Sequence, residues 1–255
     1  MRKNEVKQAL KAGKLQLGVG VSQIRTPEIA RAFGAAGFDW AFVDTEHGGF
    51  GIETVQDFCR VANLVDLAPI VRVADMQYPL VARALDCGAQ GIIFPRVESP
   101  ELLAQAVRWT RFPPEGVRGY GLGGPQLAYQ QHTFADVIEF MNANTLVVLQ
   151  IETIAAFEAR DKLLSVPGID AVLIGPADLS ISLGIPGNFE HPLMVETIEA
   201  IRDSCLRHGI APGVHFRSAA LAKFWRQRGM LFLSCGNDIS FLYEKSAKVV
   251  EHLRG

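Results

Sequence analysis

Short apolar runs alternate with amphipathic stretches along the whole chain. Each run has the length and composition of a buried strand, and each is followed by apolar residues at helical spacing. Strands that alternate with helices are typical of a parallel sheet, because two neighbouring parallel strands need a crossover connection between them. The predicted strands are residues 15–21, 40–45, 68–73, 91–97, 146–151, 169–174, 210–216 and 230–234.

The stretches between these runs predict helices. Several carry end signals, such as Ser99 before Pro100 at a start and Gly88 at an end. A segment over residues 112–134 is rich in glycine and proline and predicts irregular structure. The predicted helices are residues 26–36, 52–64, 79–86, 99–109, 154–164, 191–209, 218–228 and 239–253.

The length of the chain fits one large domain. It has 255 residues, close to the ~250 residues typical of a (β/α)8 barrel. No change in composition marks a linker. We therefore predict an α/β fold with one domain over residues 1–255, a single (β/α)8 TIM barrel, in preference to an open doubly wound sheet.

Composition limits the partners and the cellular location that we expect for the protein. A net charge of -2 gives no electrostatic reason to expect nucleic acid or an anionic membrane. No apolar stretch reaches the ~18 residues of a membrane span, and the charged start of the chain lacks the form of a signal peptide. The cysteines lie far apart without a CxxC pair, which is typical of reduced thiols in a cytoplasmic protein. They are Cys59, Cys87, Cys205 and Cys235.

Polar residues gather where such a barrel places its chemistry, at the carboxyl ends of the strands. Two of them, Glu152 and Asp178, follow neighbouring strands, and a pair of carboxylates there suits a hard divalent cation. The alternative is that each acid only caps the helix that follows it. The strand-end residues are Glu46, His47, Arg72, Arg96, Glu152, Asp178, His215, Asn237 and Asp238.

His47 and Arg72 each have a catalytic and a structural interpretation. His47 precedes two glycines and follows an acid, which suits a general acid or base, but a surface-loop histidine has the same pattern. Arg72 ends an apolar strand, where it would bind a carboxylate or a developing oxyanion, or form a structural ion pair. Residues 119–124 match G-x-G-x-x-G but follow no strand, so they predict a loop over the site or an idle surface loop rather than a dinucleotide site.

Five motifs, taken in order along nearly the whole chain, resemble the HpcH/HpaI aldolase family, the metal-dependent class II pyruvate aldolases of the phosphoenolpyruvate/pyruvate barrel superfamily. Members of that family cleave 4-hydroxy-2-oxo acids into pyruvate and an aldehyde. The motif around Asp178 is the most specific of them. The motifs are Asp44-Thr45-Glu46-His47, Pro69-Ile70-Val71-Arg72-Val73, Ala84-Leu85-Asp86-Cys87-Gly88-Ala89, Gln150-Ile151-Glu152-Thr153 and Gly175-Pro176-Ala177-Asp178-Leu179-Ser180.

The resemblance implies a role for each matching residue. Glu152 and Asp178 would be the ligands of a divalent metal ion (Mg²⁺, Mn²⁺ or Co²⁺). His47 would be the catalytic acid/base, and Arg72 would stabilise the enolate. The pyruvate end would be held by Gln150, Gly175 and the backbone at Ala177.

The resemblance also implies an assembly. Asp86 matches the family aspartate that raises the basicity of the histidine. Since a barrel drawing places Asp86 at the wrong end of its helix, we expect it to act across a subunit interface. Members are typically hexamers of helix-swapped dimers, so a homohexamer with a swapped C-terminal helix is expected.

Two departures from the family leave the aldehyde undefined. Residues 119–126 lack the expected serine and nearby arginine, and strand seven ends in Gly213-Val214-His215-Phe216 instead of aliphatic residues. Three rivals stay open: a CoA-ester lyase of the same superfamily, a sugar-phosphate isomerase barrel and a non-catalytic barrel. The first usually needs more chain and a basic surface, and the second a glycine-rich phosphate site after strands seven and eight.

Overall fold

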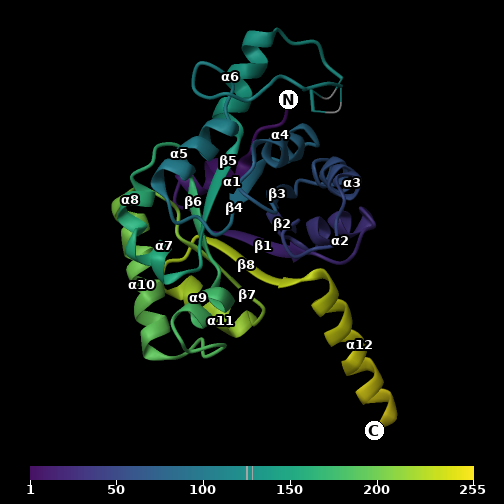
Figure 1. The fold of residues 1–255 in the computed structure, drawn as a ribbon. Coiled ribbons are helices and arrows are strands. Elements are labelled where there is room, and N and C mark those ends of the chain that lie inside the picture. Colours follow the sequence, from purple (N-terminus) through teal and green to yellow (C-terminus); the bar gives the residue numbers. More distant parts are fainter. Residues whose placement is uncertain (125, 128) are drawn as a thin grey trace.

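The computed structural model describes residues 1–124, 126, 127 and 129–255, and within them eight parallel strands close into a barrel in chain order (Figure 1). The predicted α/β barrel is therefore confirmed. Pro125, which belongs to the glycine-rich loop, lies outside the described residues. The strands are β1 (Gln16–Val21), β2 (Trp40–Asp44), β3 (Ala68–Arg72), β4 (Gly91–Phe94), β5 (Leu146–Ile151), β6 (Ala171–Ile174), β7 (Gly213–Phe216) and β8 (Phe232–Asn237).

Helices separate successive strands, and most of them surround the barrel. They are α1 (Glu5–Lys11), α2 (Glu28–Ala36), α3 (Ile52–Ala62), α4 (Tyr78–Asp86), α5 (Pro100–Trp109), α6 (Phe134–Asn144), α7 (Ile154–Glu158), α8 (Arg160–Leu164), α9 (Pro176–Ser182), α10 (Pro192–Arg207), α11 (Ala219–Gln227) and α12 (Asp238–Arg254).

The predicted element bounds are wrong in places. The single helix predicted over 154–164 is divided at Ala159 into α7 and α8. β8 runs on to Asn237, three residues past its predicted end. Helix α6 was not predicted, although Thr133 caps it by accepting from the backbone N–H of Asp136. In Figure 1, α6 projects beyond one end of the barrel.

The barrel is filled by large side chains and closed at its amino end. The rings of Trp40 and Phe232 stack with centroids 3.9 Å apart. Gly18 makes room for them, because a Cβ there would lie 2.2 Å from the Trp40 ring. Val6 and Leu10 of α1 pack on the same apolar cluster, which blocks the amino end. The carboxyl ends of the strands therefore form the mouth available for chemistry.

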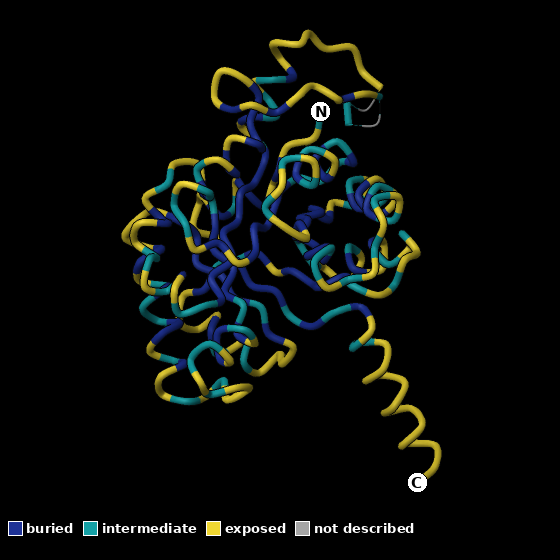
Figure 2. Tube along the Cα trace, viewed as in Figure 1, coloured by how far each residue is buried: buried dark blue, intermediate teal, exposed yellow. Residues whose placement is uncertain are grey.

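Helix α12 differs from the others because it extends away from the barrel (Figure 2). Among its described residues only Asp238 is buried. Most of its apolar side chains are exposed, and they include Leu242, Tyr243, Val249, Val250 and Leu253. Phe241 in the first turn packs against Phe33 and Phe38, and the exposed apolar side chains beyond it suit the predicted exchange between subunits. No helix in the described part of the chain is long and apolar enough to cross a membrane.

Candidate active site

Arg72 ends β3 and is held by two acids of the neighbouring β2 end. Its Nε and Nη2 donate to Asp44 at 3.0 and 2.7 Å, and its Nη1 lies 3.1 Å from Glu46 Oε2. Asp44 and Arg72 are register partners across β2 and β3. Burial acts to raise the pKa of Asp44, but the hydrogen bond and charge of Arg72 outweigh it and lower that pKa. The ion-pair interpretation of Arg72 is thus confirmed, and the pair fixes the guanidinium at the mouth.

His47 lies in the bend after β2, where its backbone N–H donates to Asp44 Oδ1 at 3.2 Å. Its side chain is 61% exposed, and its Nε2 lies 3.9 Å from Glu46 Oε2. The histidine therefore faces solvent beside a nearly buried carboxylate. This position is accessible to a substrate, as proton transfer requires.

Glu152 follows β5 and is buried at the base of the mouth. It accepts from the backbone N–H of Arg96 at 3.0 Å and from Gln150 Nε2. A Cβ at Gly175 would lie 2.8 Å from Glu152 Oε2, so only glycine leaves room for the carboxylate. Burial raises the pKa of Glu152, and the nearby charges of Glu46 and Asp178 raise it further.

Capping does not explain either predicted metal ligand. Thr153 caps α7 by accepting from the N–H of Ala156 at 3.1 Å, so Glu152 is not the cap. Asp178 is the third residue of α9, whose N-cap position is Gly175. Its carboxylate is 41% exposed and lies 4.0 Å from Arg96 Nη2. Both acids are therefore available at the mouth.

The charges around these acids fit a divalent cation. Four carboxylates face two guanidinium groups, which leaves an excess of two negative charges: Asp44, Glu46, Glu152 and Asp178 against Arg72 and Arg96. Within the described residues, no group of three or more histidine, cysteine or acidic side chains could hold a metal. Two carboxylates with water and substrate completing the shell match the way Mg²⁺ is commonly bound.

The predicted pyruvate contacts lie beside Glu152. Gln150 points into the barrel mouth, and its buried Oε1 has no hydrogen-bond partner among the described residues. No side chain caps α9. Because the first N–H groups of a helix have no partner within the helix, the N–H of Ala177 is available for a carboxylate.

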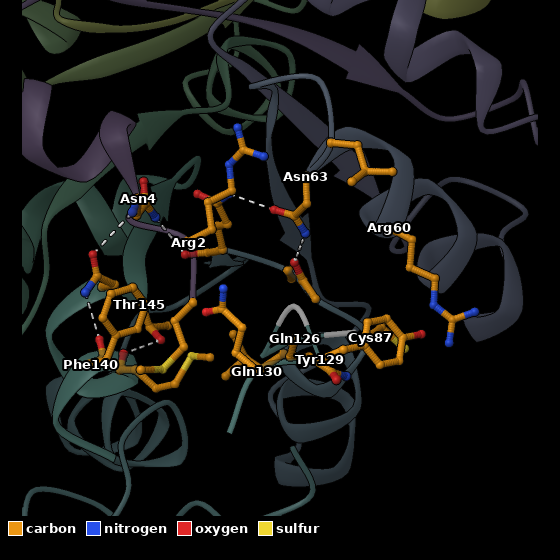
Figure 3. Close-up of a pocket in the computed structure, with 18 of the residues that line it drawn as sticks. Arg2, Asn4, Arg60, Asn63, Cys87, Gln126, Tyr129, Gln130, Phe140 and Thr145 are labelled. Atoms are coloured by element: carbon orange, nitrogen blue, oxygen red, sulfur yellow. Dashed lines mark hydrogen bonds between the residues drawn. The ribbon is translucent and has the colours of Figure 1, made fainter. Parts of the chain in front are cut away.

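Asp86 lies apart from this site, at the end of α4. It accepts from Arg118 Nη2 at 2.7 Å, and its carbonyl accepts from the side chain of Gln126. Arg118 and Gln126 line a cavity of about 800 Å³ that is bounded by the N-terminal residues, the end of α4 and α6 (Figure 3). Within one chain, therefore, Asp86 does not join His47.

The glycine-rich loop packs at the same place as Asp86. A Cβ at Gly121 would lie 2.7 Å from Asp86 Oδ2, and the N–H of Gly119 donates to the hydroxyl of Tyr78 at 2.8 Å. The described residues 119–124 therefore lie away from the mouth of their own barrel. The expectation of a loop over the site does not hold within one chain.

Three sets of contacts in the site were not predicted from the sequence. Asp44 and Glu46 hold Arg72, and the two acids at the end of the continuous apolar run of β2 are the signal that could have indicated them. Arg96 has a left-handed backbone with φ 55°, which directs its N–H to Glu152. His215 and Ser234 meet inside the barrel at 2.8 Å. Such a meeting of two strands has no signal in the sequence.

Comparisons with known proteins agree with this geometry. The sequence profile of the family described as HpcH/HpaI aldolase/citrate lyase matches residues 22–244. The 4-hydroxy-2-oxo-heptane-1,7-dioate aldolase of Escherichia coli is 34% identical over 241 residues, covering 94% of this chain and 90% of that protein. The protein of the same name from Salmonella paratyphi A is 35% identical over 240 residues, with the same coverage.

The fold of a solved relative agrees as well. The HpcH/HpaI aldolase of Desulfitobacterium hafniense DCB-2 superposes with a TM-score of 0.93 at 32% identity, covering 97% of this chain and 96% of that one. The family match spans most of the chain, and these relatives share the whole barrel. The chain belongs to the HpcH/HpaI aldolase/citrate lyase family.

Proposed function

We propose that this protein is a divalent-metal-dependent aldolase, a carbon–carbon lyase that reversibly cleaves 4-hydroxy-2-oxo acids into pyruvate and an aldehyde. The observation that carries the proposal is the cluster of acids with two excess negative charges beside a fixed guanidinium at one barrel mouth. A cation held there beside Arg72 suits the negative charge that an enolate develops. The names of the curated relatives supply the substrate class.

Each group at the mouth has a role in this reaction. Glu152 and Asp178 would hold the cation, which supplies Lewis-acid stabilisation when bound. Gln150, Gly175 and the N–H of Ala177 would orient the pyruvate end. His47 would take the proton of the C4 hydroxyl as the C3–C4 bond breaks. The bonding electrons move onto the enolate, and Arg72 would stabilise the charge on its C2 oxygen.

Asp86 would complete the site from another subunit. Because it lies at the opposite end of its own barrel, it could only raise the basicity of a His47 that belongs to a neighbouring chain. We propose the family assembly, a hexamer of helix-swapped dimers, in which α12 covers its apolar side chains on a partner. The cytoplasmic location stays a prediction from the sequence.

The rival activities find less support at the mouth. A sugar-phosphate isomerase would need a phosphate site after strands seven and eight. There the chain instead has a largely buried His215 against a buried Ser234. The curated relatives named above favour an aldolase over a CoA-ester lyase.

A pyruvate-release assay on a panel of 4-hydroxy-2-oxo acids tests the proposal. We expect turnover that disappears on thorough chelation and returns with Mg²⁺, Mn²⁺ or Co²⁺. Glu152→Gln should weaken the calorimetric affinity for Mn²⁺ by at least about tenfold, since it removes one of two charged ligands. Glu158→Gln, a change of the same kind on the nearby helix α7, serves as the control.

Activity that survives complete metal removal would contradict the mechanism. Unchanged Mn²⁺ affinity in Glu152→Gln would remove Glu152 from the metal site while leaving an aldolase activity open to a different ligand set.

A further inference from the structure

His215 occupies an inward-facing position near the carboxyl end of β7. Its Nδ1 lies 2.8 Å from the hydroxyl of Ser234, its register partner on β8. The imidazole meets the ring of Phe42 edge to face, with centroids 5.7 Å apart. The guanidinium of Arg72 lies over the same Phe42 ring at 4.9 Å. The histidine and the arginine therefore share one wall of the mouth.

The hydrogen bonds available to Ser234 determine which nitrogen of this imidazole carries the proton. Ser234 is fully buried, and among the described residues its hydroxyl has no partner besides His215. If Nδ1 donated to the hydroxyl, the hydroxyl proton would be buried without an acceptor, at a cost of about 1–3 kcal/mol. The serine therefore donates to Nδ1. In the neutral imidazole the remaining proton then lies on Nε2.

The Nε2–H is free to bind a ligand. Among the described residues Nε2 has no hydrogen-bond partner. Nε2 is also absent from the set of fully buried polar atoms that lack a partner. It is therefore accessible at the mouth. The imidazole also stays neutral, because burial and then the charges of Arg72 and Arg217 lower the pKa of His215 to about 4.

We propose that His215 is a specificity-determining residue whose Nε2–H donates a hydrogen bond to an oxygen on the aldehyde half of the substrate. The inference rests on the proposed aldolase function. In that function the carboxylate and the C2 oxygen of the pyruvate half already have partners in Ala177 and Arg72. The additional donor at the mouth is then left for the aldehyde half, so the enzyme should favour aldehydes that carry a hydroxyl or carboxylate group.

Two aldehydes of similar size test the proposal in the synthetic direction. Glycolaldehyde and propanal differ in a hydroxyl against a methyl group, and each is condensed with pyruvate by the metal-loaded enzyme. We expect the wild type to prefer glycolaldehyde in kcat/KM. His215→Leu should lower the ratio of the two kcat/KM values by about tenfold, the effect of one hydrogen bond. His215→Gln, which keeps an N–H donor, should retain most of the ratio.

A spectroscopic measurement tests the proton position separately. ¹⁵N spectra of histidine-labelled protein should show His215 neutral and protonated at Nε2 between pH 5 and 8. This whole range lies about one pH unit or more above the pKa of His215, which is about 4. Ser234→Ala should abolish this preference for one tautomer and lower the selectivity ratio partway. A proton on Nδ1 in the wild type would overturn the assignment.

The kinetic outcomes separate this inference from the function on which it rests. Aldol turnover with an unchanged ratio in a folded His215→Leu overturns the inference alone. A raised KM for pyruvate with an unchanged ratio does so too, since the donor would then serve the pyruvate half. Absence of turnover by the wild type with either aldehyde, and with the 4-hydroxy-2-oxo acid panel, overturns the proposed function. If His215→Leu does not fold, Ser234→Ala and His215→Gln provide the comparison.

Discussion

Arg72 illustrates how one residue can be both structural and chemical. Its three nitrogens reach Asp44 and Glu46, so the guanidinium has a fixed orientation in a buried setting. A buried cation without such partners would cost several kcal/mol. The same pairing leaves Glu46 between Arg72 and His47, which links the group proposed to stabilise charge with the group proposed to move the proton.

The pH dependence of stability should depend on His215. Its pKa in the folded state is about 4 against 6.5 for the free side chain, chiefly through burial. Between these values the unfolded chain binds a proton that the folded protein does not. The contribution of His215 to the free energy of unfolding should therefore fall as pH drops from about 6.5 to about 4, by up to about 3 kcal/mol.

Urea titrations across this pH range check the expectation. His215→Gln should flatten the decline, because it removes the group that binds the proton only when unfolded. Replacing the exposed His132 by Gln should leave the decline in place. The groups acting on the imidazole are Arg72, Arg217 and Asp44, with Ser234 bonded to it. An equal slope in His215→Gln and the wild type would contradict the assignment.

At the scale of elements, the buried carboxylate of Asp238 connects two segments at the mouth by hydrogen bonds. Asp238 begins α12 and accepts the backbone N–H groups of Ser22, Gln23 and Ile24 at 3.2, 2.9 and 2.7 Å. It therefore joins the end of β8 to the segment after β1 and holds the start of α12 in place. Since a β8–β1 pair closes the barrel, this tie lies at the point of closure.

Asp238→Ala should lower the free energy of unfolding by at least about 1–3 kcal/mol, because it leaves the backbone N–H groups after β1 without their acceptor. Chemical denaturation monitored by tryptophan fluorescence measures the change. Asp57→Ala removes an exposed acid on α3 and should change stability by less than about 0.5 kcal/mol. Equal stabilities of the two variants would show that the tie contributes nothing.

At the scale of the whole molecule, the proposed machinery is divided between the two ends of the barrel. His47 and the acids lie at the mouth, whereas Asp86 and the glycine-rich loop pack at the other end beside Arg118. One chain alone therefore does not bring all the proposed catalytic residues together. Oligomer formation, with α12 as an exposed apolar contact, would do so.

Complementation between two inactive variants tests this arrangement. Co-expressed His47→Ala and Asp86→Ala chains should recover part of the wild-type aldolase activity, since some mixed sites contain both native residues. Co-expressed His47→Ala and Arg72→Ala chains should stay inactive, because both residues belong to one chain's mouth. Equal failure of both pairs, with mixed oligomers verified by mass, would refute a site shared between subunits.

The sequence by itself determined the barrel and indicated most of the residues proposed for its chemistry. The alternation of apolar runs with amphipathic stretches depends on local periodicity, which a chain displays without folding. The rule that chemistry lies at the carboxyl ends of parallel strands then selected Glu152, Asp178, His47 and Arg72. The likeness to the family, which the comparisons confirm, depends on short motifs of the same local kind.

Only the tertiary structure decided which of these residues touch. The register of β2 against β3 pairs Asp44 with Arg72, and that of β7 against β8 pairs His215 with Ser234. Packing of the irregular segment against the end of α4 places Arg118 on Asp86. These contacts join residues that are distant in sequence, and their geometry follows from barrel closure and side-chain packing. Local patterns carry no information about such distances, so the folded barrel was needed to find them.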